Sequence, residues 1–182
     1  GVVGAGVAWH LAKQGHAITL IDPELERSVV STTREGNHLS GSAASLGVLM
    51  GHVFRRSSGR GWRLRQRSMS LWPLWVSELQ RQEPNLTLET PLLQLANGDE
   101  TLHHMRKLVD TRPDCGLSLI ERRQLQHIWP DITHGGLLSK RDGRINPLLL
   151  LKALRKALAE LPVSCVTAAV ETISRTGHGQ GG

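Results

Sequence analysis

The sequence predicts an α/β protein, and three observations support this prediction. The opening segment GVVGAGVAWHLAKQGHAITLID joins a glycine-rich turn to a helical pattern and then to a strand rich in β-branched residues. Helical and strand patterns continue to alternate over the rest of the chain. The composition, 39% hydrophobic and 21% charged over 182 residues, is ordinary for a globular protein that can bury a core.

The first predicted helix covers residues 5–14, and Gly15 is placed to end it. Its apolar face consists of Val7, Ala8, Leu11 and Ala12. A strand is predicted over residues 16–22, and Pro23 ends it. Residues 24–40 are polar and follow no clear period, which predicts a long loop.

A long helix is predicted over residues 59–82, where Pro73 is expected to kink it or to mark a new start. Its candidate buried residues are Trp62, Leu64, Leu71, Leu74, Trp75 and Leu79. The patterns that follow predict a strand at 90–96, a helix at about 99–112, and a short strand and helix within 117–128.

The last third of the chain predicts a strand over 135–145 with a turn at Asp142-Gly143. Pro147 suits the first position of a helix that runs to about Leu161. A final pair of strands is predicted over 163–173, and the closing GHGQGG is expected to be disordered.

Charge and composition exclude several classes of protein. The net charge of +6 permits an anionic ligand without indicating one. Cys115 and Cys165 are the only cysteines and lie far apart, so we expect neither a disulfide framework nor a zinc site, and a reducing, cytoplasmic setting. His103 and His104 point different ways on a helix, so no metal site is predicted. We expect no membrane span, no signal peptide and no nucleophile elbow.

The opening turn predicts a dinucleotide site. Glycines there let the backbone approach a pyrophosphate, and the helix N-terminus offers free N–H groups. With Gly1 as the second and Gly4 as the third glycine of G-x-G-x-x-G, Asp22 lies at the strand end where an acid binds ribose hydroxyls. The competing alignment, from Gly4, meets Trp9 where a small residue is needed. The first glycine and the preceding strand are absent, and a turn without ligand remains the alternative.

The segment GSAASLGVLMG, residues 41–51, is the second candidate. Residues this small let the backbone come close to a flat or anionic group. The alternative for this segment is a mobile linker.

Together these two segments resemble the FAD-dependent D-amino-acid oxidase superfamily, particularly its glycine oxidase branch. The stretch GGLLSKRDGRINPLLLLKAL adds to the resemblance, because a D-G-x-(I/V)-x-P sequence opening an amphipathic helix is similar to the middle of that family. The resemblance covers almost the whole chain and is weakest at 24–40 and after Ile173.

The resemblance implies a Rossmann-like FAD-binding domain, partial because its first strand is missing, with part of an α+β substrate domain. FAD-binding regions are expected at 1–84 and 146–176, a substrate-domain portion at 85–145, and a disordered tail at 177–182. FAD would lie with its pyrophosphate at the opening turn, its ribose at the acid, its flavin along the small segment and its adenine at the last strand. The implied residues are Gly1, Val2, Val3, Gly4, Asp22, Ser42, Ala43, Ala44, Gly47, Val48 and Val170.

The implied reaction is oxidative deamination of an amino acid or a related amine, with oxygen or a quinone as electron acceptor. Family members are longer, and their later half supplies the arginine that holds the substrate carboxylate. We therefore name no catalytic residue, and we expect the 182-residue piece alone to be inactive and poorly soluble.

A basic run, RRSSGRGWRLRQR, gives an alternative. Its six arginines are Arg55, Arg56, Arg60, Arg63, Arg65 and Arg67. Such a run could bind a phosphate backbone, but a solvated helix face is the favoured interpretation, and no nucleic acid is expected. Another FAD- or NAD-binding oxidoreductase and an inactive remnant are the remaining alternatives.

Overall fold

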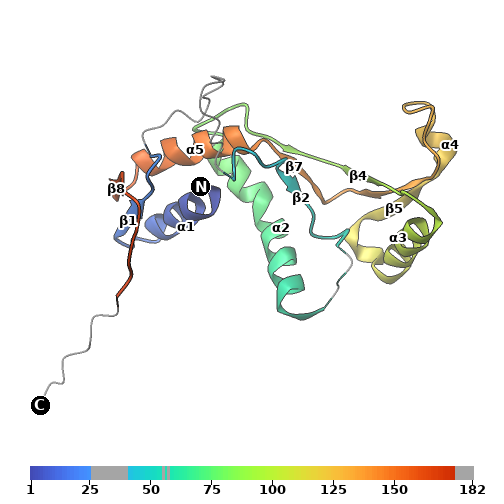
Figure 1. The fold of residues 1–182 in the computed structure, drawn as a ribbon, viewed down its shortest axis with the longest axis horizontal. Coiled ribbons are helices and arrows are strands. Elements are labelled where there is room, and N and C mark those ends of the chain that lie inside the picture. Colours follow the sequence, from blue (N-terminus) through green and yellow to red (C-terminus); the bar gives the residue numbers. More distant parts are fainter. Residues whose placement is uncertain (26–40, 55, 57, 175–182) are drawn as a thin grey trace, which may run out of the picture.

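The structure is a computed structural model that describes residues 1–25, 41–54, 56 and 58–174. Two lobes lie side by side in Figure 1, and α2 (Gly59–Leu79) descends between them. The first lobe holds α1 (Val2–Lys13), β1 (Ile18–Ile21), α5 (Pro147–Ala159) and β8 (Val163–Val166). The second holds α3 (Asp99–Thr111), a 3-10 turn at Pro113–Cys115, β5 (Leu117–Ile120) and α4 (Arg122–Leu125).

The strands of the described residues form three small sheets. β1 and β8 pair in parallel, with Ile18 opposite Val163. An antiparallel sheet has the order β2 (Val48–Leu49), β7 (Gly143–Ile145), β3 (Leu88–Glu89). A second antiparallel sheet has the order β4 (Leu92–Leu95), β6 (Gly136–Ser139), β5. The short strands β4 and β7 lie in the region that connects the two lobes (Figure 1).

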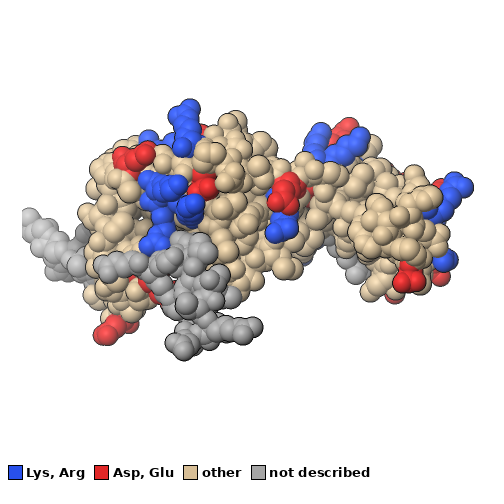
Figure 2. All heavy atoms as spheres, turned by 90° about the horizontal axis from the view of Figure 1, so that it is seen from above, with Lys and Arg blue, Asp and Glu red and all other residues tan. Residues whose placement is uncertain are grey.

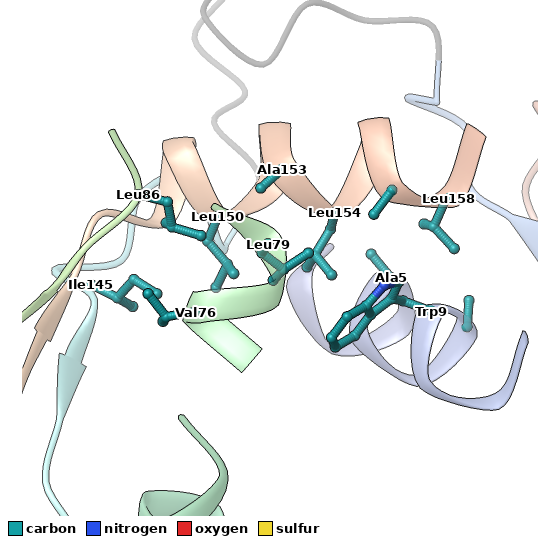
Figure 3. Packing of buried hydrophobic residues seen from close by; sticks show 12 residues of the cluster. Ala5, Trp9, Val76, Leu79, Leu86, Ile145, Leu150, Ala153, Leu154 and Leu158 are labelled. Atoms are coloured by element: carbon teal, nitrogen blue, oxygen red, sulfur yellow. The ribbon is translucent and has the colours of Figure 1, made fainter. Parts of the chain in front are cut away.

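The main core lies where α1, α5 and the last turns of α2 meet (Figure 3). Small residues on the facing sides of α1 and α5, among them Ala8, Ala153 and Ala157, let the two helices pack closely. The ring of Trp9 meets that of Trp75 edge to face, with 6.5 Å between centroids. A separate, smaller cluster in the second lobe contains Val53, Ala96, Met105 and Leu137.

Several predicted elements are confirmed. Gly15 has a φ of 86° and follows the last turn of α1. Pro147 is the first residue of α5, and the Asn146 side chain before it accepts hydrogen bonds from the N–H groups of Leu148 and Leu149 at 3.0 and 3.3 Å. The predicted loop beyond Leu25 and the closing tail lie outside the described residues.

Some details of the two N-terminal helices were predicted wrongly. α1 begins at Val2 rather than residue 5, and Val7 is 53% exposed, because the buried face is formed by Ala5, Ala8, Trp9 and Ala12. On α2, Leu64 and Leu74 are each 61% exposed, although burial was predicted. Only one side of the C-terminal half of α2 packs against the core.

The C-terminal strands also differ from the prediction. Residues 135–145 form two strands, β6 and β7, which belong to different sheets instead of one strand with a turn. The final strand pair reduces to β8, since residues 167–174 form no strand and lie exposed. Among the described residues, β1 is the one strand that pairs with β8.

Candidate cofactor site

The N-terminus of α1 forms the centre of the candidate site. Val3 and Gly4 lie in the first turn, where N–H groups have no intrahelical acceptor. Val3 is 77% exposed, and, apart from the backbone of α1 itself, no atom of the described residues lies within 4 Å of the place where a Cβ on Gly4 would stand. The helix thus presents open N–H groups and the positive end of its dipole, the arrangement that binds phosphate groups.

Asp22 lies beside this helix end because β1 finishes there. Its Oδ2 is 3.0 Å from the backbone nitrogen of Gly1, and its Oδ1 accepts a hydrogen bond from the N–H of Glu24 at 2.9 Å. The hydrogen bond from the N–H of Glu24 is the largest cause that holds the pKa of Asp22 below its ordinary value. Asp22 is therefore an ionised acceptor, and a carboxylate with two such bonds keeps lone pairs for ligand hydroxyls.

Ser42 joins the small-residue segment to the same helix end. Its Oγ accepts a hydrogen bond from the N–H of Val2 at 2.9 Å. A Cβ on Gly1 would stand only 3.1 Å from that oxygen, so the approach is close. Ala43 and Ala44 follow in the turn, and Ala44 is exposed. The structure thus brings together Gly1, Val2, Asp22 and Ser42 from the predicted set.

Gly47 and Val48 lie farther along, at β2. Gly47 has a φ of 68°, and a Cβ there would stand 1.9 Å from the carbonyl oxygen of Ile145. The N–H of Ile145 donates to the carbonyl of Gly47 at 3.0 Å. Packing against β7 therefore explains this glycine without any ligand. Val48 pairs with Arg144 and is 39% exposed.

Val170, the predicted adenine-binding residue, is not among the residues that meet at the start of α1. It follows β8 outside regular structure, and its side chain is 57% exposed. β8 itself adjoins the site, since the N–H of Asp22 donates to the carbonyl of Val166 at 3.2 Å.

A groove of about 560 Å³ opens between α1, α2 and α5, and it was not predicted from the sequence. It is mainly apolar and begins at the first turn of α1, with Val2 and Val3 on its wall. Other lining residues include Val7, Leu71, Trp72, Trp75 and Leu154. Val3 and Val7, four residues apart on α1, line this groove and are 77% and 53% exposed.

Comparison with known proteins identifies the family. The sequence model described as "FAD dependent oxidoreductase" matches residues 1–182, which is the whole chain. The chain belongs to this family of FAD-dependent oxidoreductases. The cofactor and the fold class predicted above agree with this assignment. A search among curated proteins found no match.

This chain shares its fold with solved structures of other proteins. Glycine oxidase from Geobacillus kaustophilus is 22% identical, with a TM-score of 0.71, over 91% of this chain and 44% of that one. Glycine oxidase from Bacillus cereus is 17% identical, with a TM-score of 0.70 and the same two coverages, 91% and 44%. L-proline dehydrogenase from P. horikoshii is 20% identical, with a TM-score of 0.66, over 91% and 41%. The chain thus spans less than half the length of these proteins.

Two arginines of the basic run lie against other parts of the oxidoreductase chain. The guanidinium of Arg65 lies 3.6 Å from the ring centroid of Phe54, and Arg67 lines the groove. Arg56, Arg60 and Arg63 are exposed, whereas Arg55 lies outside the described residues. On the face shown in Figure 2, positive and negative side chains are intermixed.

Two findings hold for the part of the chain that the structure describes. There, no three His, Cys, Asp or Glu side chains lie together in a way that could hold a metal ion. Within the same residues, no helix has the length and apolar character needed to cross a membrane.

Proposed function

We propose that this chain carries the FAD-binding portion of an oxidoreductase that oxidises an amino acid or a related amine. The observation that carries the proposal is the meeting of the open first turn of α1 with the ionised Asp22, 3.0 Å from the nitrogen of Gly1. Membership in an FAD-dependent family supports the cofactor. Neighbours described as glycine oxidase and L-proline dehydrogenase favour an amino acid or amine as the substrate class.

The residues present fit the cofactor. The N–H groups of Val3 and Gly4 would hold the pyrophosphate, where the helix dipole favours negative charge. Asp22 would accept hydrogen bonds from ribose hydroxyls, and Ser42 would keep the small-residue segment against the helix end. Ala43, Ala44, Gly47 and Val48 along the flavin, and Val170 at the adenine, complete the proposed set.

FAD, when bound, supplies the acceptor for a hydride from the α-carbon of the substrate, after which water hydrolyses the resulting imine to a keto acid and ammonia. The chain's own contribution is to orient the substrate carbon and to exclude water. Val48 and Met50, which are 39% and 45% exposed, offer apolar surface for this purpose. Oxygen or a quinone as electron acceptor, and a cytoplasmic location, belong to the same proposal.

FAD titration of the purified chain tests the proposal. We expect the wild-type chain to quench FAD fluorescence on binding, and Asp22→Asn to weaken affinity by about ten- to a hundredfold, because a charge-assisted hydrogen bond to ribose is lost. Asp110→Asn, an exposed carboxyl on α3 in the other lobe, is the matched control and should bind normally. Binding of NAD in preference to FAD, or equal affinities in both variants, would count against the site.

A further inference from the structure

The backbone that follows β2 is held by a buried carboxylate from the connection between β6 and β7. Asp142 is fully buried, and its Oδ1 accepts hydrogen bonds from the N–H of Gly51 at 2.7 Å and of His52 at 3.0 Å. Its Oδ2 accepts from the N–H of Val53 at 2.9 Å. The ring Nδ1 of His52 lies 3.0 Å from Oδ1 as well. One side chain therefore satisfies three consecutive backbone N–H groups.

An arginine holds the carbonyl groups of the same stretch. Nη1 of Arg112, at the end of α3, donates to the carbonyl of His52 and, at 2.8 Å, to that of Phe54. The guanidinium also stacks over the ring of Trp62 on α2, with Cζ 4.6 Å from the centroid. Arg112 is itself buried, so this contact operates where solvent screening is weak.

The strand that follows Asp142 holds the preceding part of the same segment. Val48 and Leu49 of β2 pair with Arg144 and Gly143 of β7. Gly143 has to be a glycine here, since a Cβ would stand 2.2 Å from the carbonyl oxygen of Glu89 on β3. Residues 142–145 thus fix a continuous stretch of backbone, from Gly47 to Val53, by strand pairing at one end and by a carboxylate at the other.

We propose that Asp142 and Arg112 are positioning residues for the cofactor, which set the path of the segment from Val48 to Phe54 and thereby the face that β2 presents to the flavin. This inference rests on the proposed function, because it assigns the segment a cofactor to face. Both side chains act through the backbone that they hold.

Two variants test the inference. Asp142→Asn keeps the size of the side chain but turns one acceptor into an NH₂ group, which faces a backbone N–H. Arg112→Lys keeps the charge but loses the planar guanidinium that stacks over Trp62, and its nitrogen sits on a differently shaped side chain. The matched control is Leu125→Ala on α4, a buried residue of the same lobe that lies outside the segment. We call the hydrogen bonds of Asp142 and Arg112 to the backbone of residues 51–54 the clasp. Leu125→Ala should lower stability without changing the clasp.

The readouts are amide hydrogen exchange over residues 48–54 and FAD affinity by titration. We expect both clasp variants to exchange faster in this segment and to bind FAD about tenfold more weakly, while Leu125→Ala melts earlier but keeps wild-type exchange there and wild-type FAD affinity. If one clasp variant fails to fold, the other carries the test.

The outcomes separate the two proposals. Wild-type exchange over residues 48–54 in both variants would overturn the clasp, and so would unchanged FAD affinity in variants whose segment exchanges faster. Failure of the wild-type chain to bind FAD would instead overturn the proposed function, and with it the role of the clasp toward a cofactor.

Discussion

Gly4 and Gly47 both belong to the proposed cofactor site, but their surroundings predict opposite effects of adding a methyl group. Gly47→Ala forces a Cβ to within 1.9 Å of a backbone oxygen at a φ of 68°, so we expect a loss of about 1–3 kcal/mol in unfolding free energy. Gly4→Ala meets open space inside a helix and should gain about 0.5–1 kcal/mol. Urea denaturation measures both changes.

The Gly4→Ala and Gly47→Ala variants also distinguish an effect on stability from an effect on cofactor binding. The methyl group of Gly4→Ala occupies the open space where a pyrophosphate would approach, so FAD affinity should fall although the chain becomes more stable. A Gly47→Ala variant as stable as wild type would show that β7 does not pack as described. Undiminished FAD affinity in Gly4→Ala would place the pyrophosphate elsewhere.

The buried carboxylate of Asp142 makes stability depend on pH in the acid range. Burial tends to raise its pKa, but the hydrogen bonds from His52, Gly51 and Val53 outweigh burial and hold the pKa below its ordinary value of 3.8. A lowered pKa in the folded state contributes stability above 3.8, which is lost as the pH falls through the folded-state value. Urea midpoints between neutral pH and pH values below 3.8 should fall less steeply for Asp142→Asn than for wild type. Parallel curves would contradict this.

At the scale of the element, α5 carries the main core. Leu154 is 2% exposed and packs in the cluster with α1, so Leu154→Ala should cost about 2–5 kcal/mol in thermal or urea unfolding. Leu74→Ala, at a residue of α2 that is 61% exposed, is the matched control and should change stability by about 0.5 kcal/mol or less. A large effect at Leu74 would mean that α2 packs by a different face.

Element types were predictable from local patterns, but element faces and partners were not. The Pro147 start and the Gly15 end follow from local backbone chemistry, and both are confirmed. The exposure of Val7 and Leu64 depends on which helix lies beside them, and no periodicity within one helix contains that information. For the same reason the Asp142-Gly143 pair indicated a turn in the sequence, whereas its contact with residues 51–53 arises only from the tertiary fold.

At the scale of the whole molecule, the apolar groove of about 560 Å³ lies between α1, α2 and α5 and brings together segments far apart in the sequence. A hydrophobic dye should bind there and fluoresce. Val7 lines the groove and is 53% exposed, so Val7→Lys should reduce that fluorescence with little change in melting temperature. The exposed Val170→Lys, outside the groove, is the control. Equal dye binding by both variants would mean that the groove is closed in solution.

The part of the candidate site that is formed by one continuous segment could be predicted from the sequence. Glycine spacing and the strand end placed Asp22 near the helix start, and the structure puts it 3.0 Å from the nitrogen of Gly1. Ser42 lies at the same helix end through a contact across 40 residues. Small residues alone do not indicate a ligand, as Gly47 shows. The close carbonyl oxygen of Ile145 already requires a glycine at that position. The division into regions at residues 84 and 145 stays a prediction.

The structure of this chain with FAD bound would test the central claim most directly. We predict pyrophosphate oxygens within hydrogen-bonding distance of the N–H groups of Val3 and Gly4, with a ribose hydroxyl donating to Asp22. A pyrophosphate lying elsewhere, for example along the groove between α1 and α2, with the first turn of α1 unoccupied, would contradict the account.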